Sequence, residues 1–193
     1  MGVALWIVPS ATEAAELRKF MDQPPLETEI SPYPSFPPHI TLGSFPSETP
    51  LSEITSAITS LADPLRIKFK SIDVGDHFFR SVFISIENTT KLRELHGAIH
   101  DALKLERKTP NFPHLSLYYI AESKASERQL VLDNLWKKGR LVRLSEGEVA
   151  LNLDHSGGQE RLISEFAAKE AVIALCDGPV EEWKILDTIT LCL

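Results

Sequence analysis

The pattern of apolar segments predicts an α+β fold built on antiparallel sheets. Strand-like segments and amphipathic helices are mixed along the chain without a strict βαβα alternation, which argues against a parallel sheet. Two strand-like segments near the end of the chain flank Asp177-Gly178-Pro179, a sequence typical of a hairpin turn. No shift of composition marks a linker within the 193 residues, so we expect residues 1–193 to form a single domain.

The first 61 residues contain two expected strands, two expected helices and a proline-rich loop. Val3–Val8 is a short apolar, β-branched run typical of a buried strand. Ser10 and Glu13 have the spacing of a capping box, and apolar residues then recur at helical intervals. Residues 22–38 include six prolines, which favours extended loop backbone. A strand through 39–45 follows, and then a helix with the apolar residues Ile54, Ala57, Ile58 and Leu61.

The rest of the sequence predicts two more helices and six more strands, of which the last two form a hairpin. Residues 65–74 and 78–86 alternate like paired antiparallel strands that turn near Gly75-Asp76. The clearest helix spans 91–105, and a strand at 114–120 follows a second proline-containing break. The remaining elements are a helix with Leu130, Leu135 and Trp136, a strand at 148–153, and a closing hairpin of 170–176 with 183–191.

Charge and composition exclude several classes of partner. The chain has 20 Lys and Arg against 27 Asp and Glu, a formal net charge of −7, so we expect no binding to DNA. The longest apolar runs are six residues, far below the ~20 needed to span a bilayer, and no charged segment precedes the first one. Two cysteines do not make a disulfide framework. We therefore expect an intracellular, soluble, cytoplasmic monomer.

One short segment occurs twice and carries the most specific signal. Pro38-His39-Ile40-Thr41-Leu42 and Pro113-His114-Leu115-Ser116-Leu117 share the pattern Pro-His-apolar-hydroxyl-Leu. Each copy opens an expected strand, in which alternate side chains point to opposite faces. Each copy therefore places an imidazole and a hydroxyl on one face, while its aliphatic residues are buried on the other. Two such strands could form a cleft where two histidines and two hydroxyls converge.

This set of groups suits the hydrolysis of a phosphate ester. In-line displacement at phosphorus needs a base for the attacking water and an acid for the departing oxygen. Histidine serves either role near neutral pH, and the hydroxyls of Thr41 and Ser116 can donate hydrogen bonds to the phosphate oxygens. A strained five-membered cyclic phosphate is a natural substrate, because ring strain lowers the barrier without a metal. The sequence shows no dedicated metal site, so we expect no metal and no cofactor.

The chain resembles the 2H phosphoesterase superfamily, and within it the fungal and plant cyclic nucleotide phosphodiesterases that act on ADP-ribose 1″,2″-cyclic phosphate. The resemblance rests on the two motifs, on their order and on their separation. The stretches that support it are Leu5-Trp6-Ile7-Val8-Pro9, Phe36-Pro37-Pro38-His39-Ile40-Thr41-Leu42-Gly43 and Phe112-Pro113-His114-Leu115-Ser116-Leu117-Tyr118-Tyr119, together with Trp183. It spans essentially the whole chain, although residues 140–170 contribute little.

The resemblance implies a two-lobed fold in which two antiparallel sheets line a central cleft, with helices outside. It implies His39 and His114 as the acid/base pair, Thr41 and Ser116 as phosphate ligands, and Tyr119 as a substrate contact. Tyr119 lies five residues after His114, so a bend or strand end must bring it to the same face. The sequence does not say which histidine is the base.

The implied reactions open ADP-ribose 1″,2″-cyclic phosphate to ADP-ribose 1″-phosphate, downstream of tRNA splicing, and nucleoside 2′,3′-cyclic phosphates to nucleoside 2′-phosphates. The chain would thus be a metal-independent hydrolase of the 2′,3′-cyclic-nucleotide 3′-phosphodiesterase type, with a small cyclic-phosphate nucleotide as its substrate. The alternatives are a 2H-type module that binds nucleotides without turnover and a 2H protein that processes RNA ends. The latter predicts a basic groove, which a chain of net charge −7 does not suggest.

Two other groups of residues have simpler interpretations. His96 and His100 have the i, i+4 spacing of a zinc pair on a helix, but no Glu follows His96 and no third ligand is evident. We expect this pair on a solvated flank of the helix. Trp6 and Trp183 are expected in the core rather than at a ligand.

Overall fold

The fold places four α-helices around antiparallel sheets. The structure is a computed structural model that describes residues 2–28, 31–106, 112–144, 147–154 and 161–192. The α-helices are α1 (Ala11–Asp22), α2 (Leu51–Ser56), α3 (Thr90–Ala102) and α4 (Glu127–Lys137). The strands are β1 (Val3–Val8), β2 (Ile40–Phe45), β3 (Leu65–His77), β4 (Arg80–Ile86), β5 (His114–Tyr118), β6 (Leu141–Arg143), β7 (Val149–Asn152), β8 (Leu162–Ile163), β9 (Glu165–Ala168), β10 (Glu170–Leu175) and β11 (Lys184–Thr190). The α+β class predicted from the sequence is confirmed.

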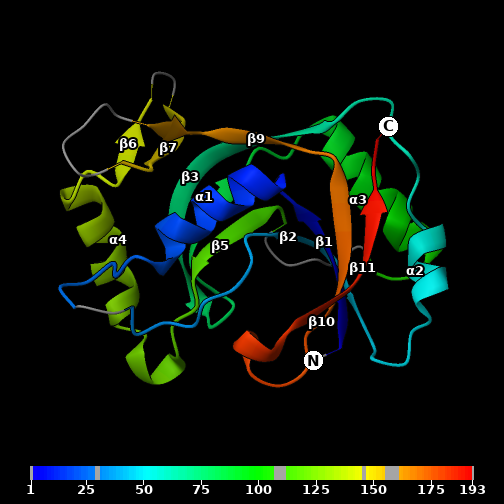
Figure 1. The fold of residues 1–193 in the computed structure, drawn as a ribbon, viewed down its shortest axis with the longest axis horizontal. Helices are drawn as coiled ribbons and strands as arrows, with labels where there is room; N and C mark the ends of the chain where they lie inside the picture. The colour runs from blue at the N-terminus through cyan, green and yellow to red at the C-terminus, as the bar shows by residue number, and fades with distance from the viewer. Residues whose placement is uncertain (1, 29–30, 107–111, 145–146, 155–160, 193) are drawn as a thin grey trace.

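Two four-stranded sheets carry the two copies of the motif. The first has the strand order β11-β10-β1-β2 and the second the order β5-β4-β3-β9. A small third sheet has the order β6-β7-β8 and lies with α4 at one end of the molecule, opposite α2 and α3 (Figure 1). All named pairings are antiparallel, as the sequence predicts. The motif strands β2 and β5 are the edges of their sheets, and these two edges contact each other.

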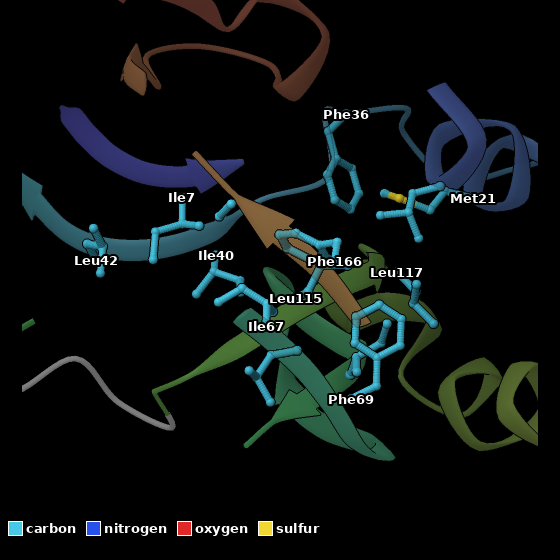
Figure 2. Packing of buried hydrophobic residues seen from close by; sticks show 14 of the residues in the cluster. Ile7, Met21, Phe36, Ile40, Leu42, Ile67, Phe69, Leu115, Leu117 and Phe166 are labelled. Atoms are coloured by element: carbon cyan, nitrogen blue, oxygen red, sulfur yellow. The ribbon is translucent and has the colours of Figure 1, made fainter. Parts of the chain in front are cut away.

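Strand alternation divides each sheet into a core face and an opposite face. Ile40 and Leu42 are fully buried on β2, and Leu115 and Leu117 are equally buried on β5. Figure 2 shows these side chains pointing into one cluster of apolar residues drawn from both sheets. The apolar face of α1 joins this cluster through Leu17, Phe20 and Met21. The aliphatic residues of the motifs thus anchor both strands, which leaves the histidines and hydroxyls for the other face.

Local signals in the sequence position several elements correctly. Ser10 caps α1, where its hydroxyl accepts from the Glu13 backbone N–H and the Glu13 carboxylate accepts from the Ser10 N–H. The proline-rich loop is held by Tyr33, whose hydroxyl donates to Glu127 of α4 at 2.8 Å. The loop also buries Phe36 in the core, as Figure 2 shows. It therefore enters β2 along a fixed path.

Two details of the fold differ from the sequence prediction. β3 continues beyond Gly75-Asp76 to His77, so the turn lies at Phe78 and Phe79. The cause is a pair of register shifts against β4, which lengthen the hairpin by extra residues on β3. In α4, Leu130 is 51% exposed, because the buried face of that helix consists of Arg128, Val131 and Leu135. None of the helices among the described residues is both long and apolar enough to cross a membrane.

Candidate active site

One cavity of about 540 Å³ lies where β2 and β5 meet. All five residues predicted from the sequence line it, namely His39, Thr41, His114, Ser116 and Tyr119. It therefore joins two motifs that lie 75 residues apart in the chain. Aromatic side chains and a thiol complete much of the wall, and among them are Trp6, Phe79, Cys176 and Trp183.

His39 is held in one orientation directly before β2. Its Nδ1 lies 2.7 Å from the Pro37 carbonyl oxygen, which can only accept, so Nδ1 carries the proton and donates it. Its ring stacks on Trp6 with centroids 3.9 Å apart and an interplanar angle of 16°. Burial is the main reason that the pKa of His39 is lowered to about 4. The charge of His114 also lowers this pKa, whereas the hydrogen bond with Pro37 raises it. At neutral pH, His39 is thus a neutral imidazole whose unprotonated Nε2 is the atom left to act on a ligand.

His114 opens β5 on the other side of the cavity. Its ring contacts the ring of Phe83 on β4, with centroids 5.5 Å apart and an angle of 74°. Because His114 is close enough to lower the pKa of His39, the two imidazoles act in one electrostatic environment. One of the two histidines strongly favours its neutral form. Such a pair can serve as acid and base in one reaction.

The two hydroxyls of the motifs differ in their present hydrogen bonds. Ser116 donates to the Phe79 carbonyl oxygen at 2.7 Å, so its proton is already used. Thr41 makes no hydrogen bond through its side chain to any other described residue. Thr41 can therefore donate to a phosphate oxygen at once, while Ser116 must first rotate away from Phe79.

Tyr119 reaches the cavity because β5 ends at Tyr118. The strand end that the sequence analysis required is therefore present. The ring of Tyr119 stacks on Phe36 of the proline-rich loop, with centroids 3.8 Å apart and an angle of 8°. Burial and the nearby Cys176 raise the pKa of Tyr119 above its ordinary value, and a hydrogen bond with Ser116 works the other way. Tyr119 is thus a neutral phenol at any physiological pH.

Trp6 and Trp183 pack in a buried apolar cluster, as the sequence predicts, and both also line the cavity. Trp6 pairs with Thr41 across β1 and β2, and directly paired residues share a face of the sheet. The side chain of Trp6 therefore lies beside His39, and Trp183 packs against it with ring centroids 5.7 Å apart. The alternation of Val3–Val8 places Trp6 opposite Leu5 and Ile7, a signal that the sequence did contain.

Cys176 is chemically quiet although it lines the cavity. Burial and the neighbouring Asp177 raise the pKa of its thiol to about 12, so it stays protonated at neutral pH. Cys192 is also a free, buried cysteine. A protonated, enclosed thiol is a poor nucleophile, and Cys176 therefore serves as an apolar part of the wall.

His96 and His100 are buried, which contradicts the expected solvated flank of the helix. They follow Leu92 and Leu95 on the buried face of α3, at the spacing i, i+3, i+4, i+7 and i+8 that also includes Ile99. That spacing is visible in the sequence and could have predicted their burial. Among the described residues, no three His, Cys, Asp or Glu side chains gather in a way that could hold a metal ion.

His100 connects α3 with the first motif strand and with the backbone of Glu106. Its Nε2 lies 2.9 Å from the Leu42 carbonyl oxygen of β2, and its Nδ1 lies 2.8 Å from the Glu106 carbonyl oxygen. Leu42 directly follows Thr41, and Glu106 precedes the segment that leads to His114. Both carbonyl oxygens are acceptors, so His100 donates to both at once only when both ring nitrogens are protonated.

Comparison with known proteins identifies relatives along most of the chain. Residues 1–191 match the family described as cyclic phosphodiesterase-like protein. The chain is 33% identical over 106 residues to the Schizosaccharomyces pombe protein named Uncharacterized protein UNK4,15, and the match covers 50% of each chain. It thus spans about half the length of that relative. It is 26% identical over 139 residues, 68% of this chain and 75% of the relative, to the Arabidopsis thaliana protein named Cyclic phosphodiesterase.

Solved structures share the fold at low sequence identity. Escherichia coli LigT, solved in complex with phosphate, has a TM-score of 0.53 at 12% identity and covers 100% of this chain and 98% of its own. The Thermus thermophilus protein TT0787 has a TM-score of 0.51 at 15% identity, covering 99% and 98%. These two similarities concern the fold alone. Because the family match extends over nearly every residue and includes both motifs, the chain belongs to the cyclic phosphodiesterase-like family.

Proposed function

We propose that this chain hydrolyses ADP-ribose 1″,2″-cyclic phosphate to ADP-ribose 1″-phosphate and nucleoside 2′,3′-cyclic phosphates to nucleoside 2′-phosphates. The observation that carries the proposal is the single cavity that contains both His-x-Thr/Ser motifs. Membership of the cyclic phosphodiesterase-like family supports the class of reaction. The ADP-ribose substrate would place the chain downstream of tRNA splicing.

His39 is the general base in this proposal. Its Nε2 takes a proton from water while the water oxygen attacks phosphorus, and Nδ1 keeps its hydrogen bond to Pro37. His114 is the general acid and gives a proton to the ribose oxygen that leaves, which is O2″ in the first substrate and O3′ in the second. The lowered pKa of His39 supports this assignment, because a base must be unprotonated at the start of the reaction.

Thr41 and Ser116 hold the non-bridging phosphate oxygens, and Tyr119 contacts the substrate from the far end of β5. Hydroxyl donors aimed at these oxygens stabilise the negative charge that develops on them without bringing in a cation. The reaction so assembled needs no metal, because each proton transfer has a side chain assigned to it.

The test is hydrolysis of ADP-ribose 1″,2″-cyclic phosphate and of the four nucleoside 2′,3′-cyclic phosphates in EDTA, followed by phosphorus NMR. Wild type, His39→Gln and His114→Gln are compared with His77→Gln, which changes an exposed histidine that does not line the cavity. We expect each cavity variant to lose about 10²- to 10⁴-fold in kcat, the usual contribution of one general acid or base. The control should keep wild-type activity, and the product isomer identifies which P–O bond breaks.

Four results would overturn the proposal. Activity that survives either cavity substitution would move the active site elsewhere, and activity lost in EDTA would require a metal. Binding of these nucleotides with no turnover would instead favour a 2H-type binding module. An RNA with a 2′,3′-cyclic phosphate end that outcompetes the free nucleotides would favour an enzyme of RNA ends.

A further inference from the structure

A second groove, of about 280 Å³, lies beside His114 on the side away from β2. Among the residues that the structure describes, no acidic one lines this groove, although the chain as a whole carries a net charge of −7. The lining residues that matter here are Lys70, Arg80, Phe83, Ser85, Asn88 and Pro113. Two cations without a carboxylate among them make the groove suited to an anion.

The groove continues the face of the sheet on which the catalytic residues lie. Ser85 on β4 is the register partner of His114, and Phe83 is the partner of Ser116. Directly paired residues on antiparallel strands point to the same face. The ring of Phe83 also contacts the His114 ring, with centroids 5.5 Å apart. A ligand bound at His114 can therefore extend over β4 without leaving this face.

Lys70 lines the groove at the position of a bulge in β3. The register between β3 and β4 shifts between Phe69 and Ser71, and the buried positions of β3 change from odd to even numbers there. Lys70 alternates with the buried Phe69, and the extra residue lets Ser71 pair with Ser85 on the same side of the sheet. Lys70 makes no ion pair with another described residue. It lies on β3, two strands from β5, at roughly 10 Å from that strand.

Arg80 is held over the floor of the groove. Its guanidinium carbon lies 5.3 Å from the centre of the Phe83 ring. Gly75 permits this arrangement, because a Cβ at that position would lie 2.2 Å from the Arg80 carbonyl oxygen. Arg80 also pairs with Asp76 at 2.9 Å, but the Asp76 side chain is 85% exposed, and such surface pairs contribute little. The fixed guanidinium retains donors for a ligand, since arginine has five N–H groups.

Another carboxylate on this face of the sheet, that of Asp73, is already engaged. Asp73 accepts from Ser71 at 2.6 Å and from Ser85 at 2.7 Å through the same oxygen, and it does not line the groove. The hydroxyl proton of Ser85 is thereby used. The donors that face the groove are therefore Lys70, Arg80 and the side-chain amide of Asn88.

We propose that Lys70 and Arg80 bind a second phosphate of the substrate, carried on C5 of the same ribose that bears the cyclic phosphate. This inference rests on the proposed function, because it assumes a cyclic phosphate at His39 and His114. One ribose ring and its C5 separate the two phosphates, a span comparable with two strand spacings of about 5 Å each. ADP-ribose 1″,2″-cyclic phosphate carries a diphosphate at that carbon, whereas a plain nucleoside 2′,3′-cyclic phosphate carries only a hydroxyl. The groove thus favours ADP-ribose 1″,2″-cyclic phosphate.

The test uses pairs of ligands that differ only by a 5′-phosphate. The first pair is adenosine 2′,3′-cyclic phosphate with and without a 5′-phosphate, compared by kcat/KM. We expect the 5′-phosphate to raise kcat/KM about tenfold, mainly through KM, as for one charge-assisted hydrogen bond. Lys70→Gln and Arg80→Gln should each reduce this ratio, and the double variant should bring it to about one. Lys91→Gln, an exposed lysine on α3 that pairs with Asp63, is the matched control and should keep the ratio.

A second pair reads binding without turnover. Adenosine 2′-phosphate and adenosine 2′,5′-bisphosphate are titrated calorimetrically into wild type and the same variants, and the ratio of Kd values should follow the same pattern. A wild-type ratio near one, or a ratio that survives the double substitution, overturns the subsite. So does an equal loss with both ligands, which would indicate a structural role. If no cyclic substrate is hydrolysed, the proposed function fails, while the Kd ratio still decides the subsite.

Discussion

His39 differs from an ordinary histidine because of three neighbours. The Pro37 carbonyl oxygen accepts a hydrogen bond from Nδ1, Trp6 covers one face of the ring, and the charge of His114 disfavours a positive charge on His39. Burial outweighs the hydrogen bond, so the neutral form is strongly favoured. A base of this kind is ready before the substrate arrives. The folded state is therefore less stable at acidic pH.

The pH dependence of kcat/KM should reflect this environment. We expect the acid limb to have its midpoint near pH 4 rather than near the ordinary 6.5 of histidine, because kcat/KM reports the free enzyme. Trp6→Leu admits water to the ring of His39 and should move the acid limb toward 6.5. A wild-type acid limb already at 6.5 would contradict this account.

Stability should depend on pH through the same residue. The unfolded chain binds a proton on His39 below pH 6.5, whereas the folded chain does so only near pH 4, so the unfolded state binds more protons in that window. The contribution of His39 to the stability of the folded state is therefore fully present above pH 6.5 and is lost as the pH falls toward 4. Between pH 7 and pH 5, we expect wild type to lose about 2 kcal/mol more than His39→Gln in denaturant unfolding. Equal losses in both proteins would show that His39 is not responsible.

At the scale of elements, the site depends on two edge strands that no backbone ladder joins. β2 belongs to one sheet and β5 to the other, and they meet only through side chains and contacts across their edges. The buried aliphatic residues of the motifs determine which face of each strand points into the core. α3 adds a polar contact through His100, which reaches Leu42 of β2 and the backbone of Glu106.

Substitution of His100 should test this link between α3 and β2. His100→Phe keeps an aromatic ring but removes both ring nitrogens, which should lower the free energy of unfolding by about 1–3 kcal/mol. Because Leu42 directly follows Thr41, we also expect a lower kcat/KM for cyclic phosphates. Glu94→Gln, on the exposed side of the same helix, is the control for both measurements. Unchanged stability and kinetics in His100→Phe would assign the two contacts no role in positioning β2.

At the scale of the whole molecule, a buried arginine ties distant segments together. Arg140 is 3% exposed, and its guanidinium donates to the carbonyl oxygen of Phe20 and to the Tyr118 hydroxyl. The same group lies 4.3 Å from the centre of the Phe20 ring. It thereby connects the end of α1, the end of β5 and the chain that enters β6. Figure 1 shows α1 lying between the end of the molecule that holds β6 and the strands that carry the site.

Replacement of Arg140 by lysine should destabilise the whole fold. Lysine keeps the charge but lacks the planar fork that serves Phe20 and Tyr118 together. We expect Arg140→Lys to lower the free energy of unfolding by about 1–3 kcal/mol, measured by denaturant titration. Arg93→Lys, an exposed arginine on α3, should change it by less than about 0.5 kcal/mol. A stability equal to wild type would mean that one strong hydrogen bond suffices at this position.

Much of the fold and the candidate site could be predicted from local patterns in the sequence. Alternation of apolar residues determines which face His39 and His114 share with their hydroxyls, because the side-chain period of a strand is two. The capping box at Ser10 marks the start of α1, and the duplicated motif identifies the family. These properties depend on residues that are neighbours in the chain, so the sequence alone determined them.

Only the tertiary structure decided how the two motifs meet and how they differ. The contact of β2 with β5, the Trp6 ring against His39 and the Pro37 hydrogen bond together make His39 the neutral imidazole. The bulge in β3 beside the second groove likewise follows from the register of β3 against β4. Burial, desolvation and the field of a neighbouring charge all depend on what the folded chain brings close. A list of residues in order does not contain those distances.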